Sequence, residues 1–286
     1  MNTAYMFPGQ GSQFSGMGAN LFARFPEECA QAERVVGYPI VEMCLERDAS
    51  RLDETRHAQP AIFLVSCLDY LDRTRGSARP DVVLGHGVGL YAALFAAGVI
   101  SLPEGLELVT RRAALMQQAI DGAMLRLVGK NALSVGDLLL RHEYADVAIA
   151  SYDAPNEVVL SGPAAQIGAI EPGLREVGFE CLRLHVTGAF HSRTIEHLRI
   201  ELMRSLVSHA FRSPSIPVVS TTSGSVVSPE HLVEELGYQL VRPVRWLQTV
   251  RQLSDQSPEI EFVAIGPGYE LSRLAQAIVS PDRVRT

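Results

Sequence analysis

The chain has 286 residues, of which 47% are hydrophobic and 20% are charged, with a formal net charge of −7. This composition is ordinary for a folded protein. The acidic balance argues against a nucleic-acid or anionic-membrane partner, because such partners require a basic face.

The first 122 residues alternate short apolar runs with longer helical patterns, which is typical of α/β proteins. Strands are predicted at Thr3–Phe7 and Asp81–His86, and helices over Ala61–Arg73, Val88–Ala97 and Pro103–Ile120. The last helix begins with a proline, whose missing N–H costs nothing at that position. These elements predict a sheet of parallel strands with helices packed on it.

The pattern changes after Gly122 to four short strands separated by two helices. The strands are predicted at Leu125–Val128, Val147–Tyr152, Glu157–Ser161 and Cys181–Val186, and the helices at Ser134–Arg141 and Pro163–Val177. A strand-helix-strand-strand-helix-strand order is the ferredoxin-like pattern. We therefore predict a small ferredoxin-like domain over residues 123–187.

The segment after Gly188 returns to longer helices with two further strands. Helices are predicted at Arg193–His209, Glu230–Leu240 and Val244–Leu253, and strands at Pro217–Ser220 and Glu261–Ile265. The predicted fold is α/β. Residues 1–122 and 188–286 form a large α/β-hydrolase-like domain with a parallel sheet, into which the small domain is inserted.

Targeting and metal-binding patterns are not found in the sequence. The first ten residues lack the basic and apolar regions of a secretory signal. The longest apolar run, Leu90–Leu102, is too short for a helix to cross a bilayer of about 30 Å. The four cysteines are scattered without paired spacing. We expect reduced cysteines, no metal, no membrane association and a cytoplasmic location.

The turn Leu84-Gly85-His86-Gly87-Val88-Gly89 is the most informative segment. A strand enters and a helix leaves, with glycines two residues before and after position 87, as in the nucleophile elbow G-x-S-x-G. The central residue here is glycine instead of serine. Glycine-rich turns of this kind also serve packing or phosphate binding. A dinucleotide-binding fingerprint does not fit, because Leu90 stands where its third glycine is needed.

Four motifs occur together in this chain: Phe7–Gln13 (FPGQGSQ), the Gly85-His86-x-x-Gly89 turn, Gly188–Ser192 (GAFHS) and Ile265–Gly268 (IGPG). Their order and spacing resemble the malonyl-CoA:acyl-carrier-protein transacylases, especially the free-standing acyltransferases that serve polyketide synthases. The resemblance covers essentially the whole chain. Any one of the motifs alone would be weak evidence.

The resemblance implies a covalent relay centred on position 87. In the family, a serine there attacks the malonyl-CoA thioester and holds the malonyl group as an ester before transfer to phosphopantetheine. His191 matches the histidine that takes the serine proton. The main-chain carbonyl of Gln239 matches the group that orients this histidine. The backbone N–H groups of Gln10 and Val88 match the oxyanion donors.

The resemblance also implies which residues contact the substrate. Arg112 matches the arginine that binds the malonyl carboxylate, a task suited to a planar guanidinium. Phe190 matches the aromatic residue that narrows the pocket, and His86 is expected beside the substrate. From the residues alone, Arg112 could be a surface arginine, Phe190 plain core and His191 structural. No cofactor is expected, since the substrates are a CoA thioester and phosphopantetheine. The expected partner is an acyl carrier protein, and the chain is expected to be a monomer.

Departures from the family leave the activity open. Glycine cannot attack a thioester, and Ser192 lies beside His191 in an extended segment, where adjacent side chains point apart. Ser151–Pro155 replaces an asparagine-rich loop, and Leu125–Val128 replaces a strand of small residues. Three hypotheses remain. The protein binds malonyl-CoA without turnover, or it uses water or an acceptor activated by His191 for hydrolysis or direct transfer, or it only docks a carrier protein.

Overall fold

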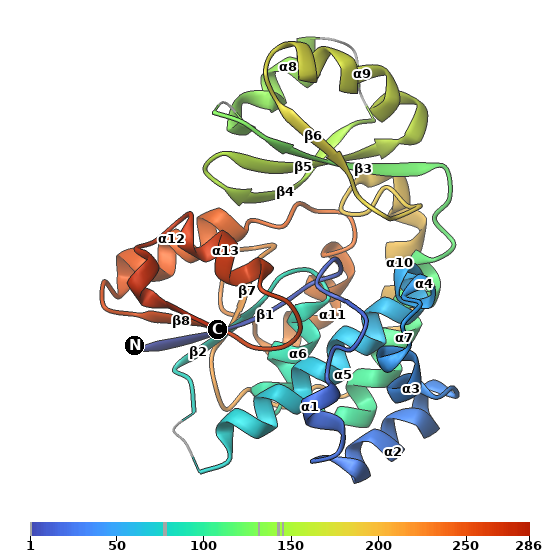
Figure 1. The fold of residues 1–286 in the computed structure, drawn as a ribbon, viewed down its shortest axis with the longest axis vertical. Helices are drawn as coiled ribbons and strands as arrows, with labels where there is room; N and C mark the ends of the chain where they lie inside the picture. The colour runs from blue at the N-terminus through green and yellow to red at the C-terminus, as the bar shows by residue number, and fades with distance from the viewer. Residues whose placement is uncertain (1, 77–78, 131, 142–143, 145) are drawn as a thin grey trace.

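The computed structural model describes residues 2–76, 79–130, 132–141, 144 and 146–286. Its strands form a five-stranded and a four-stranded sheet (Figure 1). The first sheet contains β1 (Thr3–Phe7), β2 (Val82–Gly85), β7 (Val218–Ser220), β8 (Glu261–Ala264) and β9 (Val284–Arg285), and the second contains β3 (Gly122–Val128), β4 (Ala148–Ala154), β5 (Glu157–Pro163) and β6 (Glu180–Arg183).

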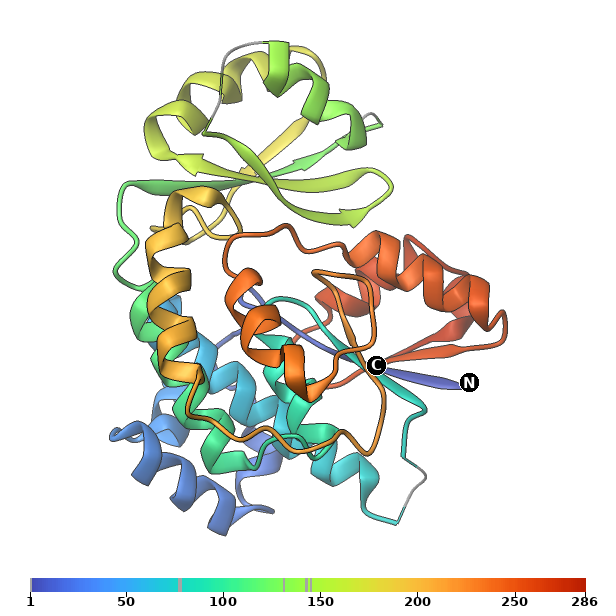
Figure 2. The ribbon, with the colours of Figure 1, turned by 180° about the vertical axis from the view of Figure 1, so that it is seen from behind.

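Helices pack against both sheets. They are α1 (Ala19–Phe22), α2 (Pro26–Val36), α3 (Ile40–Leu45), α4 (Ser50–Asp53), α5 (Thr55–Thr74), α6 (Gly89–Ala96), α7 (Leu102–Met116), α8 (Val135–Arg141), α9 (Ala164–Glu176), α10 (Glu196–Leu206), α11 (Leu232–Tyr238), α12 (Trp246–Gln256) and α13 (Glu270–Gln276). Figure 2 shows α10, α11 and the segment leading to α12 from behind.

The five-stranded sheet is parallel, with the order β7-β2-β1-β8-β9. Both of its faces are buried, because side chains alternate between two cores along the central strand. Ala4 and Met6 pack in the core that contains Trp246 of α12, whereas Tyr5 and Phe7 pack in the core formed with α5, α6 and α7. A parallel sheet covered by helices on both sides is the predicted arrangement.

The four-stranded sheet is antiparallel, with the order β4-β5-β3-β6. Helices α8 and α9 lie on the face turned away from the rest of the chain (Figure 1). Leu125, Leu127 and Leu160 of the sheet pack against Ile167 and Leu174 of α9. This confirms the predicted α/β fold with a parallel sheet and a small antiparallel one. The domain boundaries at 122–123 and 187–188 stay a prediction.

Helix α5 differs most from its predicted bounds. It begins at Thr55, whereas the apolar spacing predicted a start at Ala61, and Pro60 lies inside it. A proline normally ends a helix because it lacks an N–H. Here Thr55, Ala58 and Gln59 before the proline are all buried. Tertiary packing therefore extends the helix across Pro60. Within the described residues, no helix is long and apolar enough to span a membrane.

A cavity of about 470 Å³ lies between the two sheets. One wall comes from the segments that follow β1 and β2, and the opposite wall from β3 to β6. The carboxyl ends of parallel strands are where open α/β sheets place their ligand sites. Most of the residues singled out in the sequence lie on these walls.

Candidate active site

The turn between β2 and α6 holds Gly87 at the cavity. A Cβ at Gly85 would lie 2.1 Å from the carbonyl carbon of Gly89, and a Cβ at Gly89 would lie 2.1 Å from the oxygen of Phe7. The flanking glycines are therefore required for β1, β2 and α6 to approach one another. Gly87 has a φ of +53°, in the left-handed region. A Cβ there would meet one described atom within 4 Å, the His191 Nε2 at 3.8 Å.

His191 faces this turn with a fixed tautomer. Its backbone N–H donates to the Leu240 carbonyl at 2.8 Å, and its Nδ1 contacts the Gln239 carbonyl oxygen at 2.7 Å. Because a carbonyl oxygen only accepts, Nδ1 carries the hydrogen and Nε2 is left as an acceptor. The Arg242 carbonyl lies further from Nδ1, at 3.3 Å. The basic nitrogen is thus the one nearest to position 87.

The surroundings of His191 keep it neutral. Burial lowers the pKa of His191 to about 4, and the charges of Arg112 and His86 act in the same direction. The carbonyls of Gln239 and Arg242 oppose this shift through their hydrogen bonds. A neutral imidazole at pH 7 can accept a proton, which is the requirement for a general base.

Gln239 connects three parts of the site through its side chain and its main chain. It is 1% exposed. Its Nε2 donates to the Gly87 carbonyl at 2.8 Å, and its Oε1 accepts from Arg112 Nη2 at 3.2 Å. Sequence reasoning assigned a role only to its main chain. The side chain ties the turn to Arg112, while the main chain holds His191.

Gln59 of α5 extends this network and was missed in the sequence. Its Oε1 accepts from Arg112 Nη1 at 2.6 Å, and its Nε2 donates to Gln10 Oε1 at 3.3 Å. Gln10 in turn donates from Nε2 to the Thr55 hydroxyl at 3.1 Å. A glutamine inside a helix carries no motif, so only the tertiary contacts identify it.

Arg112 is a buried cation without a counter-ion in the described chain. It is 2% exposed and lines the cavity, whereas neighbouring Arg111 is exposed beside Glu201. Its two hydrogen bonds go to neutral glutamines, and its Nε has no partner among the described residues. Burial lowers the pKa of the guanidinium, which nevertheless keeps its charge. A buried charge in this state favours an anionic ligand.

The expected oxyanion donors are available. Within the described residues, neither the Gln10 N–H nor the Val88 N–H donates to a protein acceptor. Both residues line the cavity, as does Phe190, which is 4% exposed and also belongs to the main core. These residues therefore lie together with Gly87 and His191.

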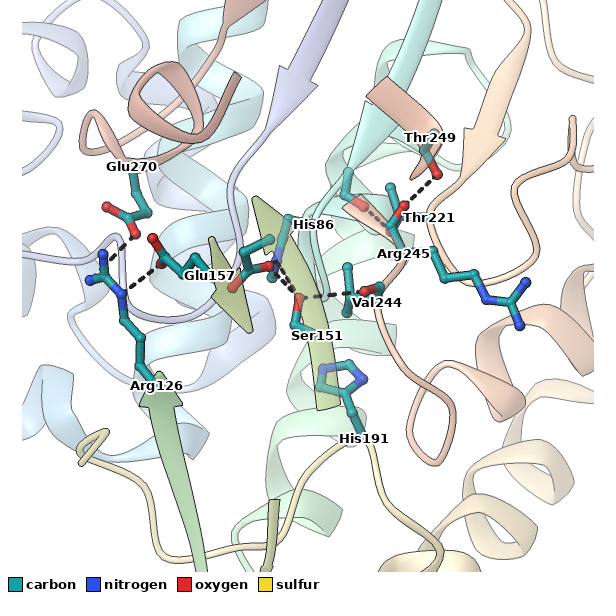
Figure 3. Close-up of polar contacts among 12 residues, drawn as sticks. His86, Arg126, Ser151, Glu157, His191, Thr221, Val244, Arg245, Thr249 and Glu270 are labelled. Atoms are coloured by element: carbon teal, nitrogen blue, oxygen red, sulfur yellow. Dashed lines mark hydrogen bonds and ion pairs between the residues drawn. The ribbon is translucent and has the colours of Figure 1, made fainter. Parts of the chain in front are cut away.

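His86 also lines the cavity, but its side chain contacts two residues of the small sheet. Its Nε2 lies 2.9 Å from Asp153 Oδ1 and 3.4 Å from Ser151 Oγ, and the two β4 residues contact each other (Figure 3). Burial favours a higher pKa for Asp153, but the hydrogen bond and charge of His86, with help from Ser151 and Arg126, lower it overall. Serine and carboxylate share one imidazole nitrogen, so this group lacks the geometry of a catalytic triad.

A second charged group joins the small sheet to α13 at the cavity edge. The Glu157 side chain is 2% exposed and lies 2.6 Å from Arg126 Nε (Figure 3). It also lies 2.8 Å from Arg273 Nη2. Arg273 also pairs with Glu270 at 2.7 Å. None of these four residues was predicted from the sequence. They connect β3 and β5 to α13.

The cysteines and acidic residues offer no evident metal site in the part of the chain that the structure describes. All four cysteines are free and buried. In the described ranges there is no group of three or more His, Cys, Asp or Glu side chains that could hold a metal ion.

Comparison with known families identifies relatives over nearly the whole chain. Residues 4–278 match the acyl transferase domain family. The chain is 38% identical to the polyketide biosynthesis malonyl CoA-acyl carrier protein transacylase BaeC of Bacillus velezensis, and the match covers 96% of each protein. It is also 38% identical to the polyketide biosynthesis protein ThaF of Burkholderia thailandensis, but it spans only 24% of that longer protein.

Solved structures agree with this comparison. A malonyl CoA-acyl carrier protein transacylase from Burkholderia pseudomallei superposes with a TM-score of 0.93 at 38% identity, covering 97% of this chain and 98% of that one. The malonyl-transacylase PlMCAT, solved in complex with the type II polyketide synthase acyl-carrier protein AntF, gives a TM-score of 0.92 at 29% identity, covering 100% and 94%.

Proposed function

The chain belongs to the acyl transferase domain family, and on that premise we propose that it binds malonyl thioesters without forming an ester-linked acyl-enzyme. The thioesters are those of CoA and of a carrier protein's phosphopantetheine arm. The protein then acts in polyketide or fatty-acid biosynthesis, as the names of its relatives indicate for them. No cofactor takes part in this function.

The burial of Arg112 without a carboxylate partner is the observation that supports malonyl as the acyl group. Its guanidinium is buried in the cavity wall with two glutamines as partners and no carboxylate in the described residues. A malonyl carboxylate would supply the missing counter-charge. It would pair with a donor that the surrounding hydrogen bonds already hold in place. An acetyl group has no such carboxylate, so it would leave the cation unpaired.

Gly87 is the reason for proposing binding without a covalent intermediate. Glycine offers no nucleophilic atom, and the hydroxyls near the cavity have other partners. Ser192 Oγ donates to the Ala189 carbonyl at 2.7 Å, and Ser12 Oγ donates to the Gly9 carbonyl at 2.8 Å. Ser151 Oγ contacts Asp153. These contacts support a family member in which the nucleophile serine is replaced.

A carrier protein is the proposed macromolecular partner. The structurally similar PlMCAT was solved with an acyl-carrier protein. The free N–H groups of Gln10 and Val88 would hold the thioester carbonyl of either substrate. Pure docking of a carrier protein, without recognition of the acyl group, remains the alternative and is an outcome of the test below.

Titration calorimetry with malonyl-CoA and acetyl-CoA tests this function. We expect malonyl-CoA to bind at least about tenfold more tightly, since a charge-assisted pair contributes about 1.5–3 kcal/mol. Arg112→Gln should remove this preference, and Arg111→Gln, on the exposed face of the same helix, should retain it. Equal affinity for the two thioesters would contradict the proposal. Binding of a carrier protein but of neither thioester would favour the docking alternative.

A further inference from the structure

The space beside Gly87 points to a reaction with water. A side chain at this position would meet only the His191 Nε2 within 4 Å among the described atoms, at 3.8 Å from its Cβ. Glycine therefore leaves room next to a nitrogen that accepts hydrogen bonds. A water molecule has a liquid volume of about 30 Å³, similar to that of a small side-chain group. We infer that the protein hydrolyses the thioester it binds, with water in the place of a seryl hydroxyl and His191 as the base.

His191 has the two properties that this role requires. Its Nδ1–H is held by the Gln239 carbonyl at 2.7 Å, so Nε2 is the nitrogen that can take a proton. Burial and the neighbouring charges keep the ring neutral at physiological pH, with a pKa of about 4. No other described residue hydrogen-bonds to Nε2. The base is oriented before the substrate arrives.

The atoms and electrons of this hydrolysis balance with the groups that the site supplies. The water oxygen attacks the thioester carbonyl carbon while Nε2 takes one water proton. The carbonyl electrons move to the oxygen, where the N–H groups of Gln10 and Val88 stabilise the negative charge. The tetrahedral intermediate then collapses, the C–S bond breaks, and the departing thiolate takes the proton from Nε2. The products are the free acid and the thiol of CoA or phosphopantetheine, and no oxidant or further reactant is needed.

The polar network positions the thioester for this attack. Arg112 is linked through Gln59 to the Gln10 side chain and through Gln239 to the Gly87 carbonyl. A malonyl carboxylate held by Arg112 would therefore fix the acyl carbonyl relative to both the oxyanion donors and the elbow. This step rests on the proposed binding of malonyl thioesters.

The expected rate is modest. Serine proteases that lack triad members keep roughly 10³–10⁴-fold acceleration over water from the oxyanion hole and binding alone. Proton transfer by a positioned histidine contributes typically about 10²–10⁴-fold. We expect thiol release from malonyl-CoA at least about 10³-fold faster than in buffer.

The test measures thiol release in water enriched in ¹⁸O, with binding followed separately by calorimetry. The native protein should release CoA and place one ¹⁸O atom in each malonate. His191→Gln should lower the rate at least about 10²-fold, because an amide cannot take the proton. Gly87→Ala fills the water position with a methyl group, so it should also lower the rate while malonyl-CoA still binds.

Gly87→Ser is the folding control, because it introduces the same backbone strain as Gly87→Ala. Its malonylation would show that a side chain at position 87 is tolerated. Binding of malonyl-CoA without thiol release would overturn the hydrolysis and leave the proposed function standing. Absence of binding would overturn both. An equal rate in His191→Gln, or malonate without ¹⁸O, would also overturn the hydrolysis.

Discussion

The two walls of the cavity are held in place by different kinds of contact. On the first wall, formed by the large sheet, main-chain carbonyls make most of the contacts: those of Gln239 and Leu240 accept from His191, and that of Gly87 accepts from the Leu90 N–H and the Gln239 side chain. On the second wall, formed by the small sheet, carboxylate side chains make the contacts, as in Asp153 with His86 and Glu157 with Arg126. Main-chain geometry survives the loss of one side chain. The placement of His191 and of the free N–H groups of Gln10 and Val88 therefore does not depend on a side chain at position 87.

The largest expected effect comes from introducing a hydroxyl at position 87 on the first wall. In Gly87→Ser the new Oγ would lie one bond beyond a Cβ that is 3.8 Å from His191 Nε2. We expect stoichiometric malonylation of the protein and transfer to a carrier protein at least about 10³-fold faster than in the native chain. Intact-mass spectrometry and a carrier-loading assay measure the two steps. A folded but unacylated variant would show that the rest of the site has also lost the activity.

Much of the first wall could be predicted from the sequence because its groups lie in local motifs. Gly87, Val88, Gln10 and His191 belong to short segments whose order along the chain is informative. Gln10, Gly87 and Val88 meet at one cavity because the carboxyl ends of β1 and β2 lie side by side. His191 reaches the same cavity through its contacts with Leu240 and Gln239. Arg112 could be assigned to the site only through the resemblance to the family, since its position on a helix also fits a surface arginine.

The second wall could not be predicted in the same way. Asp153, Glu157 and Arg273 lie in ordinary strand or helix positions, and their partners are far away in sequence. Charged residues in such positions are most often solvated, so no local pattern separates a buried ion pair from a surface one. Gln59 was missed on the first wall for the same reason.

A smaller effect is expected from removing one carboxylate charge on the second wall. Glu157→Gln leaves Arg126 and Arg273 without their shared carboxylate, which is 2% exposed. We expect a loss of about 2 kcal/mol in the free energy of unfolding, less than for a fully buried pair because both arginines are partly exposed. Glu261→Gln removes an exposed partner of Arg285 and should lower the free energy of unfolding much less than Glu157→Gln does. Equal losses in urea denaturation would contradict the difference between the two pairs.

Asp153→Asn, on the same wall, should destabilise the protein less than Glu157→Gln does. The asparagine oxygen can still accept from His86 Nε2, but the charge that strengthens the bond is lost. We expect about 1 kcal/mol of destabilisation. Asp53→Asn, at an exposed carboxylate on the cavity rim, serves as the matched control. A loss above 3 kcal/mol would mean that the charge itself holds the wall.

A further effect concerns the pH dependence of stability through His191. Its folded pKa of about 4 lies below the ordinary 6.5, so the unfolded chain binds the extra proton between these values. Its contribution to stability is therefore fully present above pH 6.5 and is lost as the pH falls through about 4. The difference in unfolding free energy between native protein and His191→Gln isolates this contribution. A difference that does not change from pH 7 to pH 4 would contradict the buried, neutral histidine.

The absence of a covalent intermediate at Gly87 is tested most directly by intact-mass spectrometry of the native protein after mixing with malonyl-CoA. We expect the unmodified mass at all times, including while calorimetry shows the substrate bound. A mass increase of one malonyl group, mapped to any side chain beside His191, would contradict this expectation.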